Sequence, residues 1–395
     1  MSADSDRAID HSHTDPVPLE DSRGYQPRQM VLLGAGLAHL HVLEQLAARP
    51  LVGARINLVA PQPRQIYSGL LPGFVAGRYT LDECVLHLEP LVRRAGIRWL
   101  TRSVRGLDAH AQTVLFDDGS TLHYDWLSVN TGPVQNRSRI EASLPGAREH
   151  ALFIRPLETF AALWPKVAEM GSKQALRIAV IGGGAAGIEL SMAVRRRLPN
   201  AAITLLCGDA PAGASFPAGT RSRMQAALRA RRITLIQDNA VGIKTSEVIL
   251  GSGARLACDV PLIAIGAQAP PWLESSGLAL DAQGFIAVDA HQRSISHANV
   301  FAAGDVSTRQ DRPLARNGVY ALRAGPALAH NLAAVVAGQA LKTYQPPANS
   351  LSLLSCGDGR AIASYGNFSA SGRWVWWLKN SIDRQFARRY PAQPG

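Results

Sequence analysis

The chain contains no paired-cysteine motif. Its four cysteines are Cys84, Cys207, Cys258 and Cys356, and no two of them have CxxC or CxxxxC spacing. Cysteines this far apart in the sequence indicate neither a redox dithiol nor a zinc ribbon, so no metal site is predicted. Reduced, mostly buried cysteines are typical of a cytoplasmic protein, which is the predicted compartment. The alternative is a redox role for distant cysteines that meet in space.

Long hydrophobic runs are also absent. Hydrophobic residues make up 47% of the 395, yet no apolar stretch approaches the roughly 20 residues that a membrane-spanning helix needs. The first 27 residues have no apolar core, and their acidic residues are Asp4, Asp6, Asp10, Asp15, Glu20 and Asp21. We therefore expect residues 1–27 to be a disordered leader and not a signal peptide.

Acidic residues are fewer than basic ones, 30 against 41, so the formal net charge is +11. The surface should therefore attract anions. Aromatic residues amount to only 6%, and the chain has no recognised nucleic-acid-binding motif, so no nucleic acid is predicted as a partner. Nucleotide cofactors and an anionic membrane surface account better for the charge.

Two glycine-rich turns of one type are present. The first is VLLGAG at 31–36 and the second is AVIGGGAAG at 179–187; each follows an apolar run and precedes a helical pattern, at 37–48 and 185–197. Glycines permit a tight turn and let the backbone approach a pyrophosphate, which sits on the N–H groups of the helix start. A third signature, VFAAGD, follows at 300–305. Together the three predict two dinucleotides bound by one chain.

The alternation of strands and helices predicts an α/β fold with two Rossmann-like units, each a parallel sheet covered by helices on both faces. Predicted strands are 29–34, 55–60 and 126–132 in the first unit and 177–182, 202–207 and 260–266 in the second. The signature at 300–305 is assigned to the first unit, so the second unit is predicted to be an insertion. The expected boundaries are 28–155 plus 285–340, 156–284, and a C-terminal region at 341–395. That last region should hold a hairpin, 350–356 with 360–366, and then a helix.

This order of motifs resembles the flavoproteins of the pyridine nucleotide-disulfide oxidoreductase superfamily. The chain looks most similar to type II NADH:quinone oxidoreductases and to the FAD oxidoreductase subfamily found alone or fused ahead of selenide water dikinase. The resemblance covers residues 29–390. It rests on the glycine turns, YSGLLPG at 67–73, AGD at 303–305, GVYALR at 318–323 and RAIAS at 360–364.

The resemblance implies that the first unit binds FAD. The residues expected to contact FAD are Gly34, Ala35, Gly36, Thr131, Gly132, Gly304, Asp305, Asn317, Gly318 and Val319. The helix that begins near Asn317 would direct its positive end at the N1–C2=O edge of the flavin. Two positions depart from the family pattern. His39 replaces the third glycine and is interpreted as a packing variant, and Ala60 replaces the usual acidic residue at the end of the second strand.

The inserted unit keeps all three glycines, Gly182, Gly184 and Gly187, and the resemblance assigns it NADH or NADPH. Cys207 stands where an acidic residue would mark NADH, and Asp209 is a substitute two residues further on. We expect NADH. The alternative is a unit that keeps its fold but no longer binds a nucleotide well.

Glu189 is the predicted catalytic residue, because related quinone reductases carry a glutamate here beside the nicotinamide and the flavin. The alternative is a first-turn carboxylate that interacts with its helix dipole. Hydride transfer itself depends on positioning. Residues 66–73 hold no cysteine, so a dithiol relay of the glutathione-reductase kind is excluded and the flavin face is left for an external acceptor.

The end of the chain suggests the acceptor. Within 373–389, Trp374, Trp377, Leu378, Ile382 and Phe386 recur at helical spacing; the basic residues are Arg373, Lys379, Arg384, Arg388 and Arg389, against Asp383. This pattern predicts that residues 371–395 contact the inner face of the cytoplasmic membrane peripherally, within reach of a quinone. The alternatives are an ordinary docking helix and a homodimer contact.

The sequence as a whole predicts a FAD-dependent NAD(P)H dehydrogenase that passes electrons to a quinone-like acceptor, with Tyr320 and Cys356 near the acceptor. One alternative is a soluble flavin reductase acting on a selenium or sulfur compound. Another is a redox-sensing flavoprotein. A sulfide:quinone oxidoreductase would need a second cysteine beside Cys356, and no evident partner matches that pattern.

Overall fold

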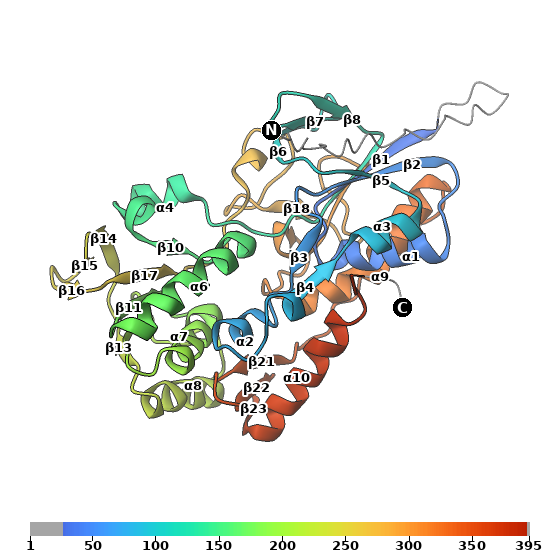
Figure 1. Ribbon diagram of the computed structural model, residues 1–395. Coiled ribbons are helices and arrows are strands. Elements are labelled where there is room, and N and C mark those ends of the chain that lie inside the picture. The colour runs from blue at the N-terminus through green and yellow to red at the C-terminus, as the bar shows by residue number, and fades with distance from the viewer. Residues whose placement is uncertain (1–26, 393–395) are drawn as a thin grey trace, which may run out of the picture.

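The computed structural model describes residues 27–392, so the predicted leader at 1–27 lies almost wholly outside the described residues. Two five-stranded sheets form the body of the molecule (Figure 1). Both are parallel, and together they confirm the predicted α/β class with two Rossmann-like sheets.

The first sheet has the strand order β19-β9-β1-β2-β5. Its strands are β1 (Arg28–Leu33), β2 (Ala54–Val59), β5 (Arg98–Leu100), β9 (Trp126–Val129) and β19 (Val300–Ala302). In β1, Met30 and Leu32 pack with the helices, whereas Val31 and Leu33 pack on the opposite face. This period of two is what a strand buried on both sides requires.

The two faces of the first sheet are covered differently. Helices α1 (Leu37–Ala48), α3 (Glu89–Ala95) and α9 (Gly318–Val336) cover one face. The other face carries the antiparallel sheet of β6 (Val104–Asp108), β7 (Thr113–Phe116) and β8 (Thr121–His123), together with β18 (Ile286–Val288), β20 (Ser307–Arg309), η2 (Pro271–Leu273) and η3 (Gly304–Val306). The prediction of helices on both faces is therefore wrong for this sheet.

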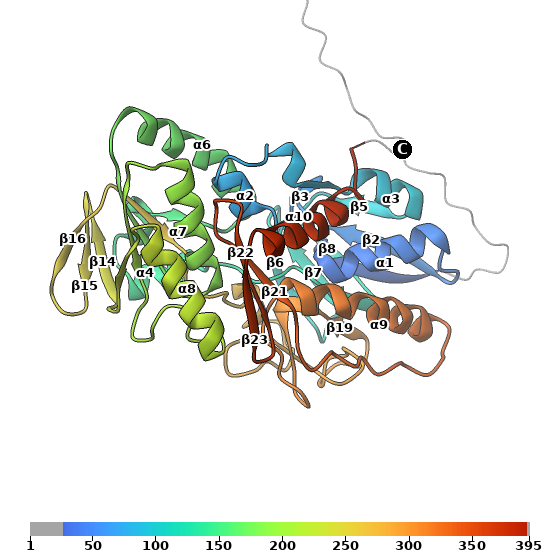
Figure 2. The ribbon, with the colours of Figure 1, turned by 90° about the horizontal axis from the view of Figure 1, so that it is seen from below.

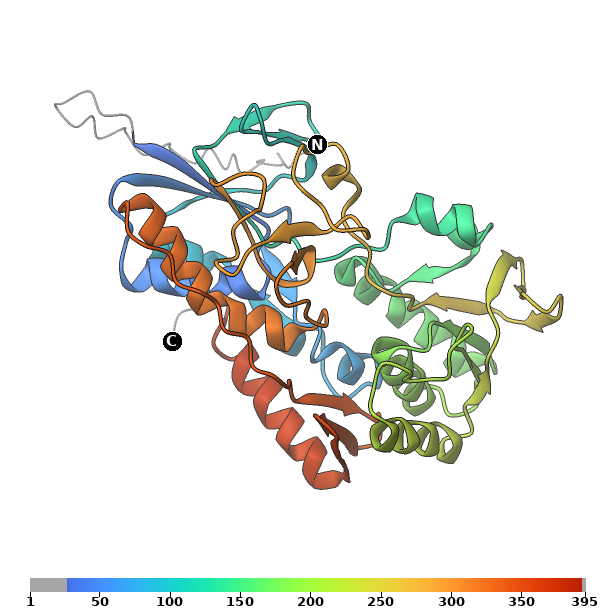
Figure 3. The same ribbon diagram turned by 180° about the vertical axis from the view of Figure 1, so that it is seen from behind.

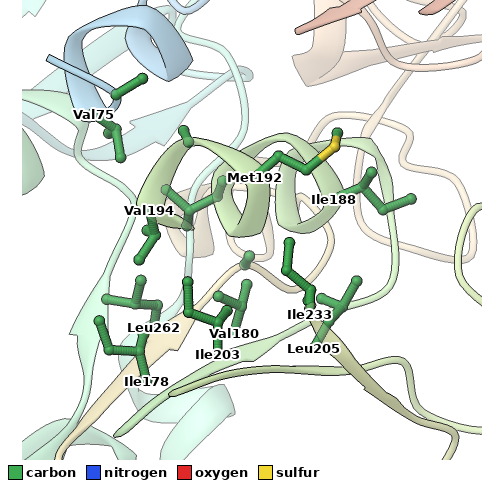
Figure 4. Packing of buried hydrophobic residues seen from close by; sticks show 14 of the residues in the cluster. Val75, Ile178, Val180, Ile188, Met192, Val194, Ile203, Leu205, Ile233 and Leu262 are labelled. Carbon is green, nitrogen blue, oxygen red and sulfur yellow. The ribbon is translucent and has the colours of Figure 1, made fainter. Parts of the chain in front are cut away.

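The second sheet has the order β10-β17-β11-β12-β13. Its strands are β10 (Leu152–Phe153), β11 (Arg177–Ile181), β12 (Ala202–Leu206), β13 (Thr234–Ile236) and β17 (Val260–Ile263). One face packs against α6 (Leu157–Lys173), α7 (Ala185–Arg197) and α8 (Ala218–Ala230). Figure 4 shows Val180 and Ile203 of this sheet beneath Met192 of α7.

The opposite face of the second sheet carries a small antiparallel sheet and two short helices. These elements are β14 (Ala240–Lys244), β15 (Glu247–Leu250), β16 (Arg255–Ala257), α4 (Arg137–Ser143) and α5 (Ala147–His150). Long helices therefore cover only one face here as well. The strand β10 belongs to this sheet and begins a few residues before the expected boundary at 156. The strand β19, although it follows the whole second sheet in the chain, pairs with β9 of the first sheet.

The C-terminal region spans both units. The predicted hairpin around residues 357–359 is confirmed, because β21 (Ser352–Ser355) pairs antiparallel with β22 (Ala361–Tyr365). A third strand, β23 (Phe368–Gly372), was not predicted; it leads directly into α10 (Arg373–Ala387). The small sheet contacts α7 and α8, while α10 reaches η1 (Asp82–Cys84). Figures 2 and 3 show α10 lying between α9 and the second unit.

Candidate functional site

The first glycine turn connects β1 to α1. Gly34 has φ +83°, in the left-handed region that favours glycine. A Cβ atom there would lie 2.7 Å from the carbonyl oxygen of Asn130, and one on Gly36 would collide with the side chain of Asn130. Neither position accepts a larger residue, so the turn presents only backbone at Gly34 and Gly36. Ala35 lies between the two glycines, and Thr131 and Gly132 directly follow Asn130.

His39 is fully buried under this turn. One ring nitrogen, Nδ1, lies 2.5 Å from the Gly34 carbonyl oxygen, and the other, Nε2, lies 2.8 Å from Oγ of Ser128. Burial lowers the pKa of His39 to about 4, although the bond to Gly34 opposes this shift. The ring is therefore neutral near pH 7: Nδ1–H donates to Gly34 and Nε2 accepts from Ser128. The packing role interpreted from the sequence agrees with these contacts.

Gly304 and Asp305 lie beside the first turn, at the end of β19. Gly304 has φ +74°, and a Cβ there would be 2.8 Å from Nδ2 of Asn130. The Asp305 carboxyl group is half-buried, and burial raises its pKa, while the charges of Arg155 and Arg316 oppose that rise. Sequence reasoning missed Arg155, which follows β10 of the other sheet and shows no motif of its own.

Helix α9 begins beside Asp305. Asn317 is its N-cap, and the Oδ1 atom accepts from the amides of Val319 and Tyr320 at 3.0 Å each. Two of the first free amides of the helix are thus used by its own cap. The helix dipole still places positive charge at Gly318, but the amides of Val319 and Tyr320 are not open to a flavin carbonyl in this arrangement.

The second glycine turn connects β11 to α7. Gly182 has φ +130°, and a Cβ on Gly187 would collide with the Gly182 carbonyl oxygen. In contrast, a Cβ on Gly184 would meet no atom within 4 Å. The start of α7 therefore opens onto free space, which suits a bound phosphate group.

At the end of β12, Cys207 is half-buried, and burial raises its pKa. The Asp209 carboxylate, two residues on, is exposed and accepts from Nδ2 of Asn239 at 2.5 Å. Both side chains lie where an adenosine ribose is expected in folds of this type, and Asp209 is already engaged by a neighbour.

Glu189 is brought together with residues of two other elements. Its Oε1 atom accepts from the backbone amide of Ser355 at 2.6 Å. Burial raises the pKa of the Glu189 carboxyl group, and the nearby charge of Lys379 is the largest opposing influence. Lys379 of α10 donates from Nζ to the Gly69 carbonyl oxygen at 3.0 Å and to Oδ2 of Asp383 at 2.7 Å.

The segment at 67–73 closes this cluster and leads into the short helix α2 (Leu71–Val75). It belongs to the connection between the antiparallel strands β3 (Arg64–Ile66) and β4 (Val85–His87). The Tyr67 hydroxyl donates to Oδ1 of Asp383 at 3.2 Å. Burial lowers the pKa of Lys379, but the charges of Glu189 and Asp383 outweigh it, so the net shift is upward. Lys379 was counted among the basic residues of the predicted membrane contact, with Asp383 as the one acid; the structure corrects this, because both are buried.

The outer face of α10 is apolar. Trp374, Trp377, Leu378 and Ile382 are exposed, with Trp377 at 65%. Tyr365 and Phe368, which pair at the tip of the hairpin of β22 and β23, are exposed as well. The prediction that Phe386 lies on this face is wrong: Phe386 is buried, and its ring centroid is 4.7 Å from that of Tyr67. Among residues 27–392 no helix is both long and apolar enough to cross a bilayer.

Two residues named as neighbours of the acceptor lie in different surroundings. Tyr320 is half-buried on the first turn of α9. Cys356 is buried at the end of β21, and burial raises the pKa of its thiol to about 12. All four cysteines are free, and a thiol with so high a pKa is a poor nucleophile at neutral pH.

Comparison with known proteins gives a family. The family model described as pyridine nucleotide-disulphide oxidoreductase matches residues 28–333. The chain is 25% identical, over 77% of its length, to the alternative NAD(P)H-ubiquinone oxidoreductase C1 of Arabidopsis thaliana, of which it spans 66%. It is 26% identical to demethylphylloquinone reductase NdbB of Synechocystis sp., covering 72% of this chain and 73% of that protein.

Solved structures show the same fold at lower identity. NDH2 from Plasmodium falciparum in complex with NADH superposes with a TM-score of 0.75 at 13% identity, covering 93% of this chain and 99% of that one. The sulfide:quinone oxidoreductase from Aquifex aeolicus gives a TM-score of 0.75 at 17% identity, covering 93% of each chain.

Proposed function

Because this chain belongs to the pyridine nucleotide-disulphide oxidoreductase family, we propose that it is a FAD-dependent NAD(P)H dehydrogenase that reduces a quinone-like acceptor at a membrane surface. The observation that carries the proposal is the position of α10. Its inner face contacts the segment at 67–73, where family members with a redox disulfide carry cysteines, and its outer face is apolar and exposed.

FAD fits the first unit. The bare backbone at Gly34 and Gly36 accommodates a pyrophosphate, and the Asp305 carboxylate is available to accept hydrogen bonds from the ribityl hydroxyl groups. Arg155 supplies a half-buried positive charge near Asp305. When bound, FAD would supply the chemistry of hydride acceptance and electron transfer. The residues of the first unit would bind and orient it.

NAD(P)H fits the second unit, with its pyrophosphate on the open start of α7. The non-acidic Cys207 leaves the 2′-position of the ribose without a carboxylate partner, so discrimination between NADH and NADPH should be weak. The overall reaction is NAD(P)H + H⁺ + quinone → NAD(P)⁺ + quinol. One proton must therefore reach the acceptor from the protein or from water.

Glu189 and Lys379 are suited to hold that proton. Burial raises the pKa of the Glu189 carboxyl group, so it carries a proton at a higher pH than an exposed glutamate. Lys379 retains its charge because Glu189 and Asp383 surround it. The two groups would exchange a proton with the reduced acceptor while Asp383 and Tyr67 hold Lys379 in place.

The membrane contact is assigned to the outer face of α10. Trp374 and Trp377 would enter the headgroup boundary of an anionic phospholipid surface, and the exposed Arg373 and Arg388 lie at the two ends of the helix. A lipid quinone could then approach the segment at 67–73 without leaving the bilayer edge.

One experiment tests the function. The purified protein is reduced with NADH under anaerobic conditions, with and without ubiquinone in anionic liposomes, and the flavin absorbance is followed. Fast bleaching and quinone-dependent reoxidation support the proposal. Slow bleaching without reoxidation would favour the redox-sensing alternative, and a protein that binds no flavin would refute the proposal altogether.

A further inference from the structure

The two glycine turns of this chain differ in what lies beneath them. Asn130 directly follows Val129, which pairs with Leu33, and Ala264 directly follows Ile263, which pairs with Ile181. Asn130 and Ala264 are therefore corresponding positions, one under each turn. The same strand pairings match Ser128 with Leu262. His39 corresponds to Gly187, because each occupies the third-glycine position of its turn. At these three positions the first unit has polar residues, whereas the second unit has alanine, glycine and leucine.

Asn130 is 2% exposed and uses its side chain in two directions. Its Oδ1 atom accepts from the amides of Ala38 and His39 at 3.1 Å each, inside the first turn of α1. Its Nδ2 atom donates to the carbonyl oxygen of Ala303 at 2.5 Å. The backbone takes part as well, because the amide of Gly36 donates to the Asn130 carbonyl oxygen at 3.0 Å.

These bonds join two segments that are far apart in the chain, and Asn130 itself lies 173 positions before Ala303. One is the glycine turn with α1, and the other is Ala303 with Gly304 and Asp305. They are the two arms of the cradle assigned to FAD. Ala264 cannot make such a link in the second unit, because a methyl group carries no donor or acceptor.

His39 and Ser128 hold the turn from below. The neutral ring of His39 donates to Gly34 and accepts from Ser128, so every polar atom of the imidazole is satisfied inside the core. The amides of α1 that a phosphate would use in the second unit are occupied here by Asn130. Binding in the first unit must therefore depend more on the fixed shape of the cradle than on free helix amides.

We infer that Asn130 is a positioning residue for the flavin cofactor. Its side-chain amide holds the glycine turn and the Ala303–Asp305 segment at a fixed separation, and the His39–Ser128 pair fixes the position of the turn. The inference rests on the proposed binding of FAD in the first unit. It makes the cradle preformed in the apoprotein, so FAD enters without having to order either arm.

The test measures the dissociation constant of FAD for the apoprotein by quenching of flavin fluorescence, and the absorption bands of the bound flavin. Asn130→Ala, which copies the second unit, should raise the dissociation constant at least tenfold and shift the bands. Asn57→Ala is the matched control, because Asn57 is an equally buried asparagine on β2 that bonds Gln29 and touches neither arm. It should lower the unfolding temperature and leave FAD binding unchanged.

Asn130→Asp is the second variant, which keeps the acceptor for α1 but replaces the donor to Ala303 with a carboxylate oxygen and adds a buried charge. It should also weaken FAD binding severalfold. If it binds FAD as the wild type does, the link between the arms is dispensable and the inference fails; the same holds if Asn130→Ala stays within twofold of the wild type. A wild-type protein that binds no FAD would instead refute the proposed function.

Discussion

Lys379 and Asp383 form an ion pair on the inner face of α10, with Nζ 2.7 Å from Oδ2 and side chains only 11% and 10% exposed. The spacing of four residues puts both on the side of the helix opposite Trp377. One helix thus presents a charged pair to the protein interior and an apolar face to the outside. The charged pair is hydrogen-bonded to the segment at 67–73, through the carbonyl oxygen of Gly69 and the hydroxyl group of Tyr67.

Removing the lysine should damage both stability and the acceptor step. Lys379→Met leaves Asp383 buried without its partner, which typically costs about 3–5 kcal/mol. Because Lys379 is the largest influence that lowers the pKa of Glu189, that pKa should rise further. The pH profile of quinone-dependent flavin reoxidation should then move to higher pH, as measured by stopped-flow absorbance.

Two further variants separate these effects. The double variant Lys379→Met with Asp383→Leu restores a neutral interior and should recover most of the stability, but not the reoxidation rate. Lys173→Met removes the exposed pair of Lys173 with Glu169 on α6 and should change neither, because exposed pairs are worth about 0–1 kcal/mol. Full activity in the double variant would contradict a role for Lys379 in the reaction.

The apolar outer face of α10 should determine membrane binding. Trp374→Gln with Trp377→Gln should weaken binding to anionic liposomes at least tenfold, because two large side chains no longer enter the interface. Flavin reduction by NADH should remain at the wild-type rate. Co-sedimentation measures the binding. Leu163→Gln with Met170→Gln changes two other exposed apolar residues, on α6, and serves as the control. Equal loss of binding in both double variants would argue against a docking role for α10.

Patterns local to one element predicted most of the fold. The apolar runs around Gly34 and Gly182 indicated two parallel sheets, and the hairpin at 357–359 followed from its glycines. Two features could not be read in this way. The covering of one face of each sheet by antiparallel strands depends on segments such as 104–123, whose short strands carry weak periodicity. The strand β23, rich in serine and glycine, has little strand propensity and forms because β22 lies beside it.

The candidate site shows the same division. The glycines of a nucleotide-binding turn can be recognised by their spacing in the sequence, but side chains that come together only in the folded protein cannot. His39 and Asn130 are 91 positions apart, and Lys379 lies far in sequence from both Gly69 and Glu189. The sequence grouped Lys379 with the basic residues of the predicted membrane contact, because residue type alone does not tell which side of a helix is buried. Its buried position beside Asp383 and Glu189 reverses that assignment.

The second glycine turn allows a comparison of two substitutions of the same size. Gly187→Ala should destabilise the second unit, because its Cβ collides with the Gly182 carbonyl oxygen and the start of α7 must move. Gly184→Ala has free space and a φ of −78°, so the free protein should unfold at the wild-type temperature. If the pyrophosphate of NAD(P)H sits there, its dissociation constant should still rise about tenfold, as measured by calorimetry. Unchanged NADH and NADPH affinity in Gly184→Ala would place the pyrophosphate elsewhere.

His39 should make the stability of the protein depend on pH. Its folded pKa of about 4 lies below the value of about 6.5 expected in the unfolded chain. As pH falls through 6.5, the unfolded state gains a proton that the folded state cannot take up until about pH 4, so stability is lost within this window. At pH 5.0 the loss relative to pH 7.5 should be about 2 kcal/mol. Urea unfolding followed by tryptophan fluorescence measures it.

The contribution of His39 is isolated by comparing variants. In His39→Gln the titrating ring is gone, so the free energy of unfolding should fall about 2 kcal/mol less than in the wild type between pH 7.5 and pH 5.0. His123→Gln, on the exposed strand β8, should follow the wild-type curve. If His39→Gln loses as much stability as the wild type over this range, the ring is not held neutral between Gly34 and Ser128.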